Sequence, residues 1–233
     1  MLPYTEEVLV SLFGQYNRSI WPAHVLFYAM ALAGVALALR PRKTGDRLIG
    51  VIFAAAWAWV GIGLFFLNFA AIDFSAPAYG VIFLVQAVLL TVTVVIRGKV
   101  IFRLNKNNFF CRAALVFLFF ALVVFPLLDL MAGYEWESVR VFGAGPGPTM
   151  LLTVGVLLLV DGRPPVHLAI IPLVWAFKTA VTAAWLDMPH DIGLAIVAAL
   201  GISLIIWKVF EDSPQPEGSS EAPSVDSQHI RKG

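Results

Sequence analysis

The chain has 233 residues, of which 60% are hydrophobic and only 13% are charged, and its formal net charge is +1. A soluble domain of this size cannot hide so much apolar side chain, because much of its surface must face water, so a soluble globular protein is excluded. The near-neutral charge argues against a nucleic-acid partner, and the high hydrophobicity argues against disorder in the body of the chain. The composition therefore predicts an all-α integral membrane protein.

Residues 1–19 predict an amphipathic helix that lies at the membrane interface. Thr5, followed by Glu6 and Glu7, is a typical helix start, and the acidic beginning does not fit a signal peptide. The apolar residues that recur at helical spacing are Leu9, Leu12, Phe13 and Tyr16.

The transmembrane domain is predicted at residues 20–210, because this part of the chain holds seven apolar segments of about 20 residues, the length that crosses a bilayer core. These segments are 20–39, 48–68, 77–96, 111–131, 141–160, 167–186 and 190–209. Residues 211–233 are polar and contain several prolines, which predicts a disordered cytoplasmic tail.

The fifth segment has the shortest continuous apolar run. Its clean apolar run, 149–160, would be about 18 Å long as a helix, which is too short to cross. The preceding Gly-Ala-Gly-Pro-Gly-Pro prefers turns. Two interpretations follow. We favour a loop outside the membrane that leads into a short helix, and the alternative is an irregular segment that dips into the protein before a short helix.

The basic residues predict the orientation, because short cytoplasmic loops collect Lys and Arg. All of them except Arg18, Arg140 and Lys178 fall in the 40–47 and 97–112 loops, the 161–165 turn or the C-terminal part of the chain. We therefore expect a bacterial inner-membrane protein with its N-terminus outside and its C-terminus in the cytoplasm. If the fifth segment fails to cross, the last two spans and the tail are reversed.

Small residues at four-residue spacing predict close helix contacts within the membrane. Such stripes are Gly34 and Ala38 on the first segment, Gly50, Ala54 and Ala58 on the second, and Ala195, Ala199 and Ser203 on the seventh.

Ionisable and polar residues inside the spans predict a polar pocket, because such residues are costly in a bilayer. We expect Lys178 to pair with Asp129, and the alternative is that the lysine reaches the headgroups on its own. The candidate binding residues are Lys178, Asp129, Gln86, His24, Trp175, Thr182, Asn68, His190 and Asp191.

No catalytic motif and no metal-ligand spacing is present, and Cys111 is the single cysteine, so we expect no enzyme activity, no metal and no cofactor. A retinal protein is disfavoured because Lys178 is not on the last span and has no mid-membrane carboxylate. The leading hypothesis is a small transporter or permease-like protein for a small solute or ion. The alternative is a non-catalytic membrane scaffold or a subunit of a larger complex, and a homo-oligomer or a membrane partner fits either one. A membrane enzyme is the third hypothesis.

Three motifs carry a resemblance to a known family: the YNRSIWPA segment near the start, the WAW pair and the PHDIGL segment. Over about residues 1–209 the chain resembles a family of bacterial multi-pass membrane proteins that has only a domain-of-unknown-function label. That family often has Pro-Cys-Pro-Thr where this chain has Pro146-Gly147-Pro148-Thr149, and it often lacks a lysine at Lys178. The resemblance implies a bacterial inner membrane and no particular activity.

Overall fold

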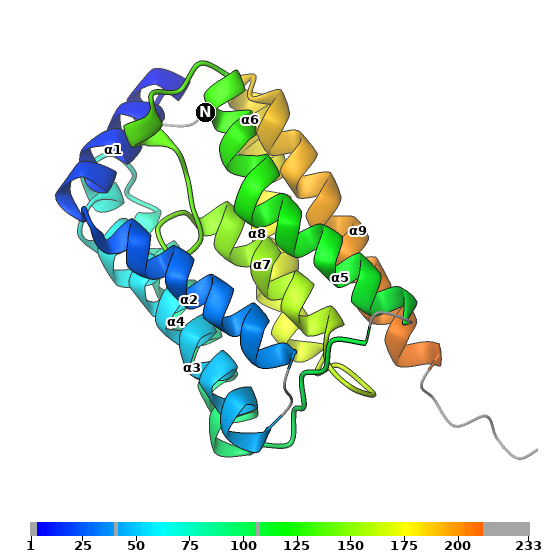
Figure 1. Cartoon of the computed structure of the whole chain (residues 1–233). Coiled ribbons are helices and arrows are strands. Elements are labelled where there is room, and N and C mark those ends of the chain that lie inside the picture. The colour runs from blue at the N-terminus through cyan, green and yellow to red at the C-terminus, as the bar shows by residue number, and fades with distance from the viewer. Residues whose placement is uncertain (1–3, 40–41, 106–107, 212–233) are drawn as a thin grey trace, which may run out of the picture.

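The computed structural model describes residues 4–39, 42–105 and 108–211, which form a bundle of helices (Figure 1). The described part has no β-strand, which confirms the all-α prediction. The helices are α1 (Glu6–Ser19), α2 (Ala23–Ala38), α3 (Lys43–Trp59), η1 (Val60–Phe66), η2 (Phe69–Ala71), α4 (Ala76–Leu90), η3 (Thr91–Ile96), α5 (Phe109–Phe119), η4 (Phe120–Val124), α6 (Phe125–Met131), η5 (Trp136–Ser138), α7 (Pro146–Leu158), α8 (His167–Leu186) and α9 (Pro189–Glu211).

Five continuous helical stretches in the described residues are long and apolar enough to cross a membrane. They correspond to five of the seven predicted segments, because π-helical turns carry α3, α4 and α5 onward without a break. The stretches are Lys43–Ala71, Ala76–Ile96, Phe109–Met131, His167–Leu186 and Pro189–Glu211. The predicted tail, 212–233, lies outside the described residues.

The first predicted segment is shorter than expected. Helix α2 has 16 residues, and α1 meets it at a bend of 88°, so a sixth span exists only if this bent pair counts as one. The helix predicted at the N-terminus is present as α1. It buries Leu9, Phe13 and Tyr16 and packs against η5, so its apolar face covers the bundle.

The fifth predicted segment contains a 13-residue helix, α7, rather than a full span. All of its residues after Pro146 are buried, because α3, α5, α8 and α9 pack around it. The chain reaches α7 through 140–145, an irregular segment that is also buried. The favoured interpretation of an external loop was therefore wrong, and the irregular segment runs inside the protein.

This buried backbone finds its hydrogen-bond partners within the protein, as a segment shielded from water requires. The Thr149 hydroxyl accepts a bond of 2.8 Å from the Gly143 amide and donates one of 2.6 Å to the Gly145 carbonyl. At the other end of α7, the Lys208 ammonium donates to the carbonyls of Leu158 and Val160. A cation at a helix C-terminus is favourable because the last carbonyls carry partial negative charge.

Different segments meet at the two ends of the bundle (Figure 1). At one end, which we call the α1 end, α1 lies against η5, and α6 ends beside the start of α9. At the other end, the segment after α4 meets the segment after α7 through a bridge between Phe102 and Val160. We call this the basic end, because the described residues in its loops and in the first turns of α3 include Arg42, Lys43, Arg47, Arg97, Lys99, Arg103 and Arg163.

The path of the chain between these ends bears on the topology. Arg140 lies at the α1 end, beside α6 and α9, and Val160 lies at the basic end. Residues 140–160 therefore run from one end to the other, although only the second part of that path is helical. Helix α8 returns to the α1 end, and α9 leads to the basic end.

The predicted small-residue stripes are buried or half-buried on α2 and α3, and most of the stripe predicted on α9 is exposed. Gly50 on α3 is packed so closely that a Cβ there would lie 2.7 Å from Val94. On α9, Ala199 and Ser203 are exposed, and the contact with α7 is made at Gly201, where a Cβ would lie 2.5 Å from Val154. The stripe predicted on α9 was wrong because small residues occur on more than one face of that helix.

Candidate functional site

A small cavity of about 50 Å³ lies near the α1 end, between the N-terminal segment and helices α8 and α9. Its volume is enough for roughly four water-sized groups. Phe13, Phe65 and Phe69 form part of its apolar wall. We call it the polar cavity, because its walls also carry Tyr4, Trp175, Lys178, Thr179, Thr182 and Asp191.

Lys178 brings a positive charge to this cavity. Its Nζ lies 4.9 Å from the ring centroid of Trp175 and 5.0 Å from that of Tyr79, which are cation–π distances. Among the described residues, Lys178 makes no ion pair and no hydrogen bond. The expected pair with Asp129 was wrong, because Arg140 already occupies that carboxylate at 2.6 Å.

Arg140 is the centre of a buried ion cluster beside the cavity. Its Nε and Nη2 donate to the two oxygens of Asp129 at 3.1 and 2.6 Å, and its backbone amide donates to the same carboxylate at 2.9 Å. Its Nη1 donates to Asp191 Oδ2 at 2.8 Å. Bidentate geometry of this kind is what makes a buried arginine tolerable. The cluster joins the end of α6 to the start of α9 through the loop before α7.

His190 and Tyr134 complete the cluster. Arg140 Nη2 lies 3.0 Å from His190 Nε2, and because arginine can only donate, Nε2 is the acceptor of this contact. Burial raises the pKa of Tyr134, so its hydroxyl stays protonated and donates to Glu6 at 3.0 Å. Helix α1 is thereby tied to the same cluster.

Three polar atoms that belong to residues lining the polar cavity have no hydrogen-bond partner in the described structure, although each is buried. They are Tyr4 Oη, Trp175 Nε1 and Asp191 Oδ1. Burial, with Asp73 nearby, raises the pKa of Tyr4, so its hydroxyl keeps its proton. A buried polar group without a partner costs about 1–3 kcal/mol, so these three atoms make the cavity wall the place where unpaired polar groups gather.

The structure brings together six of the nine predicted binding residues. Trp175, Lys178, Thr182 and Asp191 line the cavity, and Asp129 and His190 lie behind Asp191 in the ion cluster. Their role in binding stays a prediction.

The other three predicted residues lie elsewhere. Gln86 is fully buried and donates to the Leu168 carbonyl at 2.9 Å, and Asn68 donates to the Gly63 carbonyl at 2.6 Å. His24 lines a separate groove near η5. Gln86 and Asn68 therefore hold backbone within the bundle, and neither lines the cavity.

Sequence reasoning missed Arg140 and Tyr4. One signal for Arg140 was available. It is one of only two basic residues, with Arg18, that lie outside both the spans and the predicted cytoplasmic side, and it comes three residues before the Gly-Ala-Gly-Pro-Gly-Pro segment. An arginine whose neighbours are buried must itself find carboxylates. Tyr4 had no such signal, because a tyrosine near the N-terminus is usual at a membrane interface.

Comparison of the chain with protein families matches it to a family of unknown function. Comparison with curated proteins and with solved structures gave no match. The model of the family of unknown function DUF6064 matches residues 6–215, which is most of the chain. The chain therefore belongs to this family.

Proposed function

We propose that this member of the DUF6064 family is a permease-like membrane protein that binds a small polar solute in the polar cavity. In this proposal it lies in a bacterial inner membrane with its N-terminus outside, so the α1 end faces away from the cytoplasm. The solute then reaches Lys178 and Asp191 from that side.

The observation that carries the proposal is the convergence of unpartnered groups. Tyr4, Trp175 and Lys178 offer donors and Asp191 Oδ1 offers an acceptor, and all four residues line one cavity. A purely structural helix contact would be expected to pair these groups with one another. Here Tyr4 Oη, Trp175 Nε1 and Asp191 Oδ1 each have no hydrogen-bond partner among the described residues.

The charges and the volume define the class of solute. Among the residues of the cavity wall and the ion cluster, Lys178 and Arg140 balance Asp129 and Asp191, so this set is formally neutral and favours a neutral or zwitterionic solute. The solute must both accept and donate hydrogen bonds, because the walls offer both kinds of group. A cavity of about 50 Å³ limits it to a few non-hydrogen atoms. Urea and glycine are probes with these properties.

The test is solute flux into liposomes that contain the purified protein, followed by light scattering after a gradient of urea or glycine is applied. We expect flux above that of protein-free liposomes for at least one of these probes, and none for sucrose, which is too large. Lys178→Met should reduce the flux at least tenfold, because it removes the charged donor from the cavity wall. Lys99→Met is the matched control, since Lys99 is exposed at the basic end.

Two outcomes would contradict the proposal. One is flux that equals the protein-free background for both probes while the protein is folded in the liposomes. The other is equal flux for wild type and Lys178→Met. Either result would favour the alternative function, a membrane scaffold or a subunit of a larger complex.

A further inference from the structure

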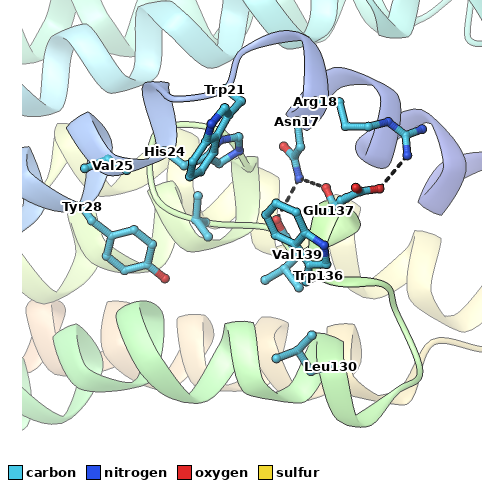
Figure 2. A pocket seen from close by; sticks show the side chains of 11 residues that line it. Asn17, Arg18, Trp21, His24, Val25, Tyr28, Leu130, Trp136, Glu137 and Val139 are labelled. Carbon is cyan, nitrogen blue, oxygen red and sulfur yellow. Dashed lines mark hydrogen bonds and ion pairs between the residues drawn. The ribbon is translucent and has the colours of Figure 1, made fainter.

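A second hollow, independent of the polar cavity, lies where α1 bends into α2 (Figure 2). It is a groove of about 650 Å³, within the range of ligand-binding pockets. Residues of α1, α2, α6 and the η5 segment form its walls. Its apolar lining includes Trp21, Val25, Leu130, Trp136 and Val139.

The rim of the groove carries one positive and one negative charge side by side. Arg18 Nη1 lies 2.6 Å from Glu137 Oε2, and the Arg18 side chain is 56% exposed (Figure 2). The mouth is therefore dipolar with no net charge. An anionic group would meet Glu137, and a cationic group would meet Arg18.

Asn17 adds an acceptor beside this pair. Its amide nitrogen donates to the backbone carbonyls of Glu137 and Val139 at 2.7 and 2.9 Å, which uses both of its N–H groups (Figure 2). Its carbonyl oxygen is buried and has no partner. This oxygen can accept a hydrogen bond from a donor that enters at the rim.

His24 lies farther along the groove, one helical turn after Trp21, whose ring is stacked on it with centroids 6.2 Å apart. Both ring nitrogens are buried and have no partner. A neutral imidazole has one N–H donor, which needs an acceptor in this otherwise apolar part of the groove. Beyond it, Val25 and Tyr28 continue the wall along α2.

We infer that the groove holds one phospholipid whose zwitterionic headgroup ends in a primary ammonium. Arg18 binds the phosphate, and Glu137 with the Asn17 carbonyl oxygen binds the ammonium. The His24 N–H donates to an ester carbonyl, and an acyl chain covers Val25 and Leu130. A choline headgroup lacks the N–H groups for Glu137 and Asn17, and an anionic headgroup brings no cation to Glu137.

The test is native mass spectrometry of the detergent-purified protein after incubation with equal amounts of palmitoyl-oleoyl phosphatidylethanolamine, phosphatidylcholine and phosphatidylglycerol. We expect one retained lipid per chain, with about tenfold more phosphatidylethanolamine than phosphatidylcholine, the ratio that one charge-assisted hydrogen bond contributes. Equal retention of the two, or a preference for phosphatidylglycerol, overturns the inference.

Two variants test the headgroup contacts and the location of the lipid separately. Glu137→Gln should abolish the preference for phosphatidylethanolamine over phosphatidylcholine, because it removes the carboxylate and keeps the backbone carbonyl that Asn17 binds. Val25→Trp fills the groove and should remove the retained lipid. Ile196→Trp, on an exposed face of α9, is its matched control.

The melting temperature of each variant shows that it is folded, and Ile196→Trp should retain lipid as wild type does. Lipid that stays bound to folded Val25→Trp overturns the location, and a preference that survives in Glu137→Gln overturns the headgroup contacts. The solute proposal is unaffected by either result, because the two sites share no lining residue.

Discussion

Arg140 shows how much one residue can hold together. Its side chain binds Asp129 at the end of α6 and Asp191 at the start of α9, and the side chains of all three residues are less than one-tenth exposed. A buried ion pair of this kind contributes little compared with an apolar contact, but breaking it is costly because a charge remains without a partner. The cluster therefore fixes the α1 end of the bundle.

Arg140→Met should lower the free energy of unfolding in detergent by about 3–5 kcal/mol, because it leaves two buried carboxylates without a cation. The control is Arg18→Met, which removes an exposed ion pair and should cost no more than about 1 kcal/mol. Equal effects of the two substitutions would show that the Arg140 cluster is accessible to water.

Lys178 and Asp129 were expected to be partners, and the structure separates them. The sequence predicts that both lie near the same end of their helices, and both do lie near the α1 end of the bundle. It cannot rank Arg140 against Lys178 as the partner of Asp129. Arg140 binds Asp129 because the loop before α7 folds into the bundle and carries the guanidinium to it. A loop that folds back into the bundle in this way leaves no periodic pattern in the sequence.

The substitutions Lys178→Met and Asp129→Asn should therefore act independently. Their coupling energy in a double-mutant cycle should be below about 0.5 kcal/mol, whereas Arg140→Gln with Asp129→Asn should couple by about 2 kcal/mol or more. Chemical unfolding of the four variants of each cycle gives both values. A larger coupling energy for Lys178 than for Arg140 would show that Lys178 is the main partner of Asp129.

Among the elements, α7 departs most from what the sequence predicts. A length of 13 residues is too short to cross a bilayer, and the Gly-Pro segment before it is irregular. Both features were visible in the sequence. The buried position of the segment was not, because it depends on α3, α5, α8 and α9 closing around the segment. Burial on all sides is a tertiary property that hydropathy alone does not show.

The contact between α7 and α9 depends on a glycine. Gly201→Ala should lower the unfolding free energy by about 1–3 kcal/mol, because the new Cβ would lie 2.5 Å from Val154. Gly193→Ala on the same helix meets nothing within 4 Å and should raise stability by up to about 1 kcal/mol through helix propensity. Thermal unfolding in one detergent compares them, and effects of the same sign would contradict the packing described for α9.

At the scale of the whole molecule, composition alone predicted the architecture. Hydrophobic segments of about 20 residues identify spans because the bilayer requires that length, and five of the seven predicted segments are continuous helices. The two exceptions are the short helices α2 and α7, of which the first follows a bend of 88° and the second follows a buried irregular segment. The side-chain partners inside the bundle were not predictable, because they depend on how the helices are rotated against one another.

The path of the chain predicts that the connection before α4 and the C-terminus lie on opposite sides of the membrane. Alkaline phosphatase fused after residue 74 should be active outside the cytoplasm, and a C-terminal fusion should be inactive. If both activities are reversed, the orientation assigned from the basic residues is wrong. If both fusions report the same side, residues 140–160 do not cross.

The most direct test of the central claim is an experimental structure in lipid nanodiscs at a resolution that shows bound water. The account predicts a small non-protein density in the polar cavity, within hydrogen-bond distance of Trp175 Nε1 and Asp191 Oδ1 and close to Lys178 Nζ. It would be contradicted by a cavity closed by a direct bond between Lys178 and Asp191, with no space left between them.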